Sequence, residues 1–184
     1  MVNYADLVEL GKLIRHLEQG ITEASLNILT YEHREEIARN LITGLLGQAD
    51  KHAMKIEASS GEYTNEIAVL QVGKNKYRLE KDHQDVFISK INHYNCRIVP
   101  GTHGILVYHI DYPGVIRDVS RILATHHINI SSMKVSREQK GKNALLVSLT
   151  DEHIDAEVMD TITRLPQITN VVALRPLEHD DYSA

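Results

Sequence analysis

The chain of 184 residues is poor in several features that define common protein classes. It has one cysteine, so no internal disulfide can form, which predicts a reducing compartment and a cytoplasmic location. A single cysteine also cannot hold an iron–sulfur cluster, which needs about four ligands. Tryptophan is absent and aromatic residues make up 5% of the chain, which argues against a surface that stacks nucleobases.

Charge and hydropathy exclude further classes. The formal net charge is -5 and no run of Lys or Arg occurs, so nucleic acid is not an expected partner. The apolar runs, such as 105–108, are far too short to span a bilayer, and the first ten residues do not resemble a signal peptide. A content of 42% hydrophobic and 24% charged residues is typical of a soluble globular protein without membrane contact.

The first half of the chain predicts a small α+β unit. Apolar residues at spacings of three and four predict a helix from the capping residue Asn3 to Gly20. A half-buried strand is expected over 21–31, and a second helix from His33 to Leu46. Extended segments follow near 54–58, 64–72, 76–80 and 86–99, with a charged connector over 80–85.

The second half predicts a different arrangement of strands and helices. The expected elements are strand 105–111, helix 114–125, strand 128–136, strand 143–150, helix 154–165 and strand 168–174. Two β-α-β units imply a four-stranded sheet with both helices on one face. Such a sheet leaves its other face and an edge open, so self-association is expected. Pro100-Gly101 marks the boundary between a domain at 1–100 and a domain at 104–176, which a tail at 177–184 follows.

The corner at Pro113-Gly114 is the most informative feature of the sequence. Glycine has no Cβ, so a small ligand can approach the backbone closely. The helix that starts there offers free N–H groups and its positive dipole end to a carboxylate. The polar residues His109, Asp111 and Asn129 are candidates to surround this corner, a pattern that predicts binding of an amino acid. The alternative is that Asp111 and Asn129 only cap the turn and the helix.

Residues 104–175 resemble the ACT domain, the βαββαβ module with a ferredoxin-like fold that senses amino acids in biosynthetic enzymes. The resemblance rests on His109 and Asp111, Pro113-Gly114-Val115-Ile116, Ile128-Asn129-Ile130, Met133-Lys134-Val135-Ser136-Arg137 and Leu165-Pro166. It implies that a ligand such as L-serine sits between two ACT modules, with its carboxylate on the N–H groups near Gly114 and Val115. The implied ligand-binding residues are His109, Asp111, Gly114, Val115, Asn129 and Ile130.

The preceding residues resemble the intervening domain, also called the allosteric substrate-binding domain, of long D-3-phosphoglycerate dehydrogenases. The matching segments include residues 7–28, TGLL at 43–46 and SSGEYTNEI at 59–67. A related pair of domains occurs in the β chain of iron–sulfur L-serine dehydratases. The sequence departs from both families, because it has neither a nucleotide-binding G-x-G-x-x-G nor the dehydratase segment GPSSSHT. The basic residues that hold an anion in some intervening domains would fall near Phe87 and Val99, so no phosphate-ester site is expected there.

These patterns predict a regulatory module without catalytic residues. It would bind a small amino acid, most simply L-serine, at the interface of an ACT homodimer and modulate a separate enzyme subunit of serine metabolism. The alternative is the β subunit of an iron–sulfur L-serine dehydratase, and a third possibility is a scaffold that only dimerises. The chain could also be a fragment of a longer enzyme.

No cofactor and no metal site is expected. The eleven histidines are scattered without i,i+4 pairs or cysteine partners, unlike zinc motifs. Cys96 lies in a predicted strand with no general base nearby in sequence, so it is interpreted as a packed thiol.

Overall fold

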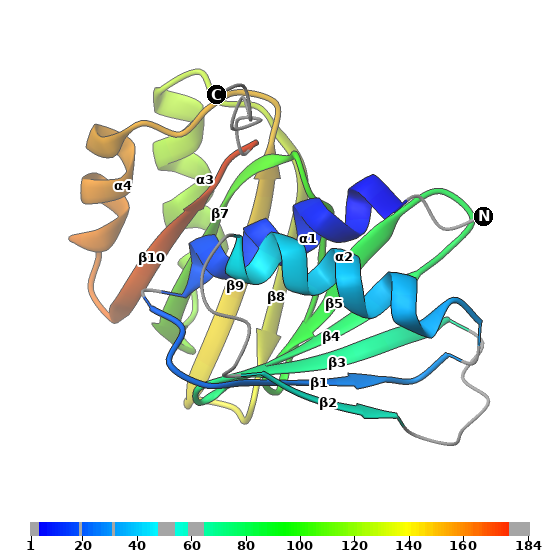
Figure 1. Cartoon of the computed structure of the whole chain (residues 1–184). Helices are drawn as coiled ribbons and strands as arrows, with labels where there is room; N and C mark the ends of the chain where they lie inside the picture. Colours follow the sequence, from blue (N-terminus) through cyan, green and yellow to red (C-terminus); the bar gives the residue numbers. More distant parts are fainter. Residues whose placement is uncertain (1–3, 19, 31, 48–53, 59–64, 177–184) are drawn as a thin grey trace.

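The computed structural model describes residues 4–18, 20–30, 32–47, 54–58 and 65–176 (Figure 1). The capping residue Asn3, most of the segment 59–67 and the predicted tail 177–184 lie outside these residues. The elements, in chain order, are α1 Tyr4–Leu17, β1 Ala24–Ile28, α2 Arg34–Leu46, β2 Met54–Ala58, β3 Glu66–Val72, β4 Asn75–Lys81, β5 Val86–Ile91, β6 Tyr94–Ile98, β7 His103–Ile110, α3 Val115–Thr125, β8 Ile130–Arg137, β9 Asn143–Thr150, α4 Ala156–Thr163 and β10 Ile168–Leu174. The predicted helices and strands are confirmed, with bounds that differ by a few residues at the ends, and the segment expected at 86–99 is two strands, β5 and β6, separated by residues 92–93.

The first half forms a six-stranded sheet in the order β2-β1-β3-β4-β5-β6. β1 and β2 are parallel, and the other neighbours are antiparallel. Short turns join β3 to β4, β4 to β5 and β5 to β6, as antiparallel pairing allows. Alternate residues of β1, β3, β4, β5 and β6 point to one face of the sheet, where they are buried together with the apolar stripes of α1 and α2.

The crossing of α1 and α2 depends on two glycines. A Cβ at Gly44 would lie 2.0 Å from the carbonyl oxygen of Val8 and 2.9 Å from the Cα of Gly11. The two helices therefore touch through their backbones, which only glycine at these positions permits.

The second half forms a four-stranded antiparallel sheet in the order β10-β7-β9-β8, with α3 and α4 on one face. A hydrophobic cluster joins this face to the helices and includes Val107, Leu146, Val119 and Val158. The architecture is the predicted βαββαβ arrangement.

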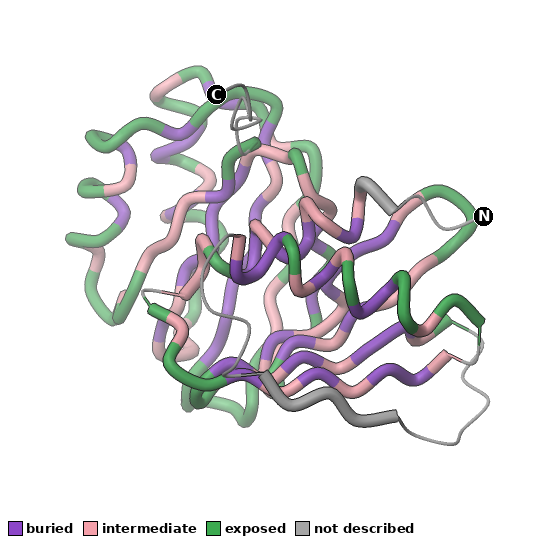
Figure 2. The backbone as a smooth tube through the Cα atoms, viewed as in Figure 1, coloured by how far each residue is buried: buried purple, intermediate pink, exposed green. Residues whose placement is uncertain are grey.

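The opposite face of the four-stranded sheet is covered, so the prediction of an open face is wrong. Leu106, Leu145, Val147 and Leu174 belong to the same buried cluster as the side chains of α1 and the six-stranded sheet. Figure 2 shows buried positions along strands of both sheets. Hydrogen bonds also cross the junction. His16 Nε2 lies 3.1 Å from the carbonyl oxygen of Ala173, and the Asn95 N–H donates to Ser136 Oγ at 3.0 Å. The first half thus supplies the second layer that an amphipathic sheet needs on its other face.

One edge of the four-stranded sheet remains open, as predicted. Within the described part of the chain, β8 pairs only with β9, and Ser131, Ser132 and Lys134 on this strand are exposed. Among the same residues, no helix has the length and apolar character needed to cross a membrane.

Candidate functional site

The corner between β7 and α3 has the backbone that the sequence predicted. Gly114 takes φ 111°, in the left-handed region that favours glycine, and it occupies the N-cap position of α3 without a side-chain cap. α4 differs, because its N-cap Asp155 accepts a hydrogen bond from the Val158 N–H at 3.0 Å. Neither Asp111 nor Asn129 caps α3; their side chains bond instead to Gly141 and to Asp151. The first N–H groups of α3 thus have no capping side chain among the described residues.

His109 contributes a buried acceptor beside this corner. The residue is 1% exposed, and its Nδ1 lies 2.9 Å from the carbonyl oxygen of Ile110. A carbonyl oxygen only accepts, so Nδ1 carries a proton, and with that tautomer Nε2 can accept a hydrogen bond. Nε2 is buried and has no hydrogen-bond partner within the described chain. The ring meets Tyr112 edge-on, with 6.1 Å between the centroids.

Asp111 is a tethered carboxylate. Its Oδ2 accepts a hydrogen bond from the Gly141 N–H at 3.1 Å and pairs with Arg137 Nη1 at 3.0 Å. The Gly141 N–H, then Arg137, lower the pKa of Asp111 below its ordinary value, so this side chain is anionic at neutral pH. Arg137 and Gly141 were missed by sequence reasoning, because strand pairing brings them to Asp111 from 26 and 30 residues away.

Two further side chains border Gly114. Arg117 binds Asp118 Oδ1 through Nε and Nη2, at 2.9 and 2.7 Å, and Tyr112 donates to Asp118 Oδ2 at 3.3 Å. A Cβ on Gly114 would lie 3.3 Å from Arg117 Nη2. The Arg117 side chain is 76% exposed, so solvent and not the core surrounds most of this guanidinium.

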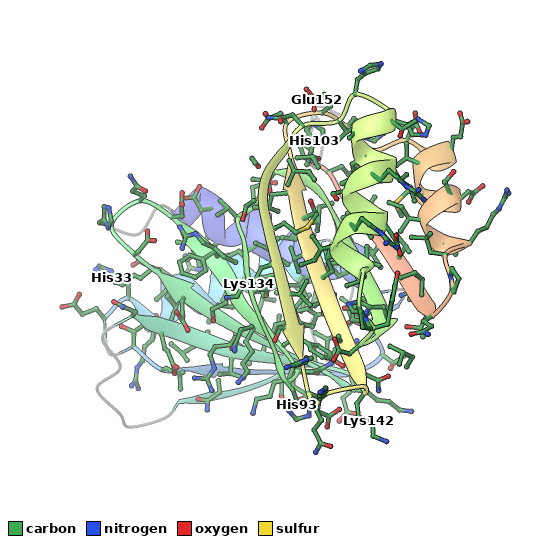
Figure 3. All side chains as sticks on the ribbon, turned by 180° about the vertical axis from the view of Figure 1, so that it is seen from behind. His33, His93, His103, Lys134, Lys142 and Glu152 are labelled. Carbon is green, nitrogen blue, oxygen red and sulfur yellow. The ribbon has the colours of Figure 1, made fainter. Side chains whose placement is uncertain are left out.

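Asn129 and Ile130 lie at the other end of the sheet from the corner. Ile130 pairs with Thr150, and Thr150 pairs with His103 at the start of β7. Asp111 lies at the opposite end of β7, directly after Ile110. The 11 residues of α3 separate the two ends by about 16 Å. Two hydrogen-bond partners mark these ends. The Glu152 carboxylate accepts the Asn129 N–H at 2.6 Å, and the Lys142 carbonyl accepts the Asp111 N–H at 2.7 Å. Figure 3 shows Glu152 and Lys142 at opposite ends of the four-stranded sheet.

Within one chain, the structure therefore brings His109, Asp111, Gly114 and Val115 together and leaves Asn129 and Ile130 apart. The Asn129 side chain donates to Asp151 Oδ2 at 2.6 Å. Val115 is buried, so only its backbone N–H can face a ligand.

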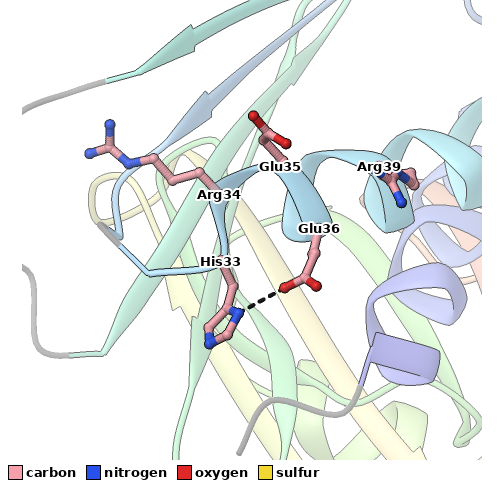
Figure 4. Close-up of a pocket in the computed structure, with 5 residues that line it drawn as sticks. All are labelled: His33, Arg34, Glu35, Glu36 and Arg39. Carbon is pink, nitrogen blue, oxygen red and sulfur yellow. Dashed lines mark hydrogen bonds and ion pairs between the residues drawn. The ribbon is translucent and has the colours of Figure 1, made fainter.

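Other candidate sites have less chemistry. A shallow hollow of about 380 Å³ at the start of α2 is lined by His33, Arg34, Glu35, Glu36 and Arg39 (Figure 4). His33 Nδ1 lies 2.7 Å from Glu36 Oε2. Cys96 is buried, and burial raises the pKa of its thiol to about 12, so it stays protonated as a packed thiol. Across the described ranges, no three His, Cys, Asp or Glu side chains are grouped to hold a metal ion.

Comparison with known proteins gives the second half a family. Residues 103–167 match the ACT domain family. The chain is 32% identical over 121 residues to a D-3-phosphoglycerate dehydrogenase of Bacillus subtilis, covering 64% of this chain and 23% of that protein. It is 29% identical over 120 residues to a probable L-serine dehydratase beta chain of the same organism, covering 65% of this chain and 50% of that protein. The chain thus spans half or less of these curated relatives.

Both alignments cover more residues than the ACT match itself. Among solved structures, the ACT domain of a GTP pyrophosphokinase from Chlorobium tepidum aligns with a TM-score of 0.32 and 18% identity, over 45% of this chain and 94% of that one. Residues 103–167 thus match the ACT domain family and have its fold, in a chain that is similar to D-3-phosphoglycerate dehydrogenases and to an L-serine dehydratase beta chain.

Proposed function

We propose that this chain is a regulatory module that binds a small amino acid, with L-serine favoured, at the corner before α3. The observation that carries the proposal is the buried Nε2 of His109, which lacks a partner among the described residues beside an uncapped helix start. A buried polar atom without a partner is rare in native proteins and calls for an explanation such as a bound molecule.

The groups at the corner match the two ends and the side chain of serine. The N–H groups at the start of α3 suit the carboxylate, and the anionic Asp111 suits the ammonium group. The serine hydroxyl can donate to His109 Nε2, which the tautomer makes an acceptor. Glycine lacks this hydroxyl, so it would leave the buried nitrogen without a partner.

A second copy of the chain would complete the site with Asn129. β8 is an open edge strand of 8 residues, about 26 Å long. Two-fold pairing of β8 with β8 of another copy would be antiparallel, so the start of one β8 would meet the end of the other. Asn129 of the second copy would then lie beside Arg137 and Asp111 of the first.

Charge complementarity supports this pairing. The hairpin that follows β8 carries Arg137, Lys140 and Lys142, whereas Asp151 and Glu152 lie beside Asn129. Two-fold pairing would bring the basic hairpin of each copy toward the acidic loop of the other.

Calorimetric titration of the purified chain with L-serine, glycine, threonine and branched-chain amino acids tests the proposal. We expect selective binding of one small amino acid, with L-serine first. Asn129→Ala should weaken that binding about ten-fold or more, because it removes a hydrogen bond to a charged ligand. Asn170→Ala, which changes an exposed asparagine on β10, is the matched control and should bind as the wild type does. Absence of heat with every amino acid would favour a scaffold and refute the proposal.

We propose that the enzyme under control belongs to serine metabolism, and the relatives suggest two classes. Similarity to a D-3-phosphoglycerate dehydrogenase favours modulation of such a dehydrogenase. The dehydratase beta chain is covered over half its length, which favours the alternative that this chain is the β subunit of an L-serine dehydratase. Purification from its source with a cysteine-rich partner that forms pyruvate from serine would establish the second class. Purification with a dehydrogenase would establish the first.

A further inference from the structure

We propose that Arg137 is an internal competitor of the effector at Asp111. In the ligand-free chain the Arg137 guanidinium occupies the carboxylate, and the ammonium group of a bound amino acid takes its place and releases the hairpin that Arg137 begins. The inference rests on the proposed function and adds a mechanism by which ligand binding changes the shape of the chain.

The hairpin after β8 is held at its base by the β8–β9 ladder, and contacts with Asp111 hold its far part against the end of β7. Residues 137–143 are all exposed, so no apolar side chain anchors this segment in the core. Three contacts tie it to Asp111 instead. Arg137 Nη1 and the Gly141 N–H lie 3.0 and 3.1 Å from Oδ2, and the Asp111 N–H donates to the Lys142 carbonyl at 2.7 Å.

The ion pair between Asp111 and Arg137 is exposed enough for a ligand to compete with Arg137 for the carboxylate. The Asp111 side chain is 18% exposed and that of Arg137 is 54% exposed, so the guanidinium can move into solvent while the carboxylate stays in place. Exposed ion pairs of this kind contribute little to stability. An amino acid whose carboxylate is held by the start of α3 and whose hydroxyl is held by His109 places its ammonium group at Asp111, where it can therefore displace the guanidinium.

A guanidinium and an ammonium group also repel each other at one carboxylate. Asp111 precedes the helix start by only three residues, so a ligand at the corner lies within reach of the same charge. Binding would thus weaken the hold of Asp111 on the hairpin. The released hairpin, with three basic residues, is the part of the ACT domain whose contacts with a neighbour would change.

Calorimetric titration of L-serine into Arg137→Gln tests the competition. If Arg137 competes, the variant binds about two- to five-fold more tightly than the wild type, the range that an exposed ion pair supplies. Lys140→Gln removes the same charge from the same hairpin without touching Asp111, and it should change the affinity less than two-fold. Equal or weaker binding by Arg137→Gln would overturn the inference while leaving the proposed function intact.

A measurement on the wild-type protein gives an independent test. With L-serine bound, the side-chain N–H protons of Arg137 should exchange with solvent several-fold faster, because their acceptor is lost. Unchanged or slower exchange in the presence of bound serine would contradict displacement. Failure of the wild type to bind any amino acid would refute the proposed function and this inference together. That result is distinct from an unchanged affinity of Arg137→Gln and from unchanged exchange of the Arg137 protons, which refute the inference alone.

Discussion

Buried polar atoms differ in whether they have a hydrogen-bond partner, and this difference affects the free energy of unfolding. Ser148 is fully buried on the helix side of β9, and its hydroxyl has no hydrogen-bond partner among the described residues. Ser136 on the neighbouring strand accepts a hydrogen bond from the Asn95 N–H across the junction of the two halves. The two serines form a natural pair for comparison.

Ser148→Ala should leave the free energy of unfolding unchanged or raise it by about 1 kcal/mol. The substitution removes a hydroxyl that is desolvated on folding and gains no hydrogen bond in return. Ser136→Ala should lower it by about 0.5–1.5 kcal/mol, since one hydrogen bond is lost. Urea denaturation measures both. A clear loss of stability in Ser148→Ala would show that its hydroxyl has a partner.

Asp82 gives the stability a dependence on acidic pH. N–H groups of Asp85 and Gln84, then Arg97, lower the pKa of Asp82 to about 2. A carboxyl whose pKa is depressed by folding stabilises the native state above its unfolded pKa of about 3.9, and this stabilisation is lost as pH falls through the folded value. The wild type should therefore lose stability between about pH 4 and 2 more steeply than Asp82→Asn. Urea midpoints at several pH values check this, and parallel curves for the two proteins would contradict it.

The helices and strands show which features a sequence can predict. Periodicity located every helix and strand, because side-chain spacing and turn residues are local properties. It identified the corner at Gly114 for the same reason. The ion pair of Asp111 with Arg137 and the attachment of Asn129 to Asp151 depend on sheet register across more than twenty residues, which local pattern does not determine.

The packing of α1 on α2 offers a sharp test of the fold. Gly44→Ala would place a Cβ against the Val8 carbonyl and the Gly11 backbone, neither of which can rotate away. We expect a loss of about 3 kcal/mol or more in the free energy of unfolding, at the upper end of overpacking effects. Gly20→Ala is the control, because no atom lies within 4 Å of the added Cβ, and it should stay within about 0.5 kcal/mol of the wild type. Equal stability of the two variants would refute the close crossing.

The two sheets share one hydrophobic cluster, which the sequence did not reveal. The four-stranded sheet was expected to leave one face open, but Leu106, Leu145, Val147 and Leu174 pack against the first half. The pattern of alternating apolar residues predicts that a face is buried, without saying which partner covers it.

The shared cluster predicts a single cooperative unfolding transition. Leu106 is fully buried at the junction, so Leu106→Ala should lower the free energy of unfolding by about 2–5 kcal/mol and shift the whole transition. Differential scanning calorimetry measures this. Two separate transitions, of which only one moves in the variant, would contradict a common core.

The proposed site requires groups from two copies of the chain, and subunit mixing tests this most directly. Asp111→Ala and Asn129→Ala should each weaken L-serine binding about ten-fold or more when measured alone. After subunit exchange of a 1:1 mixture, half of the dimers carry both variants and hold one intact site, so calorimetry should recover about one quarter of the wild-type stoichiometry at wild-type affinity. A mixture that binds no L-serine, although the wild type does, would contradict a site shared between copies.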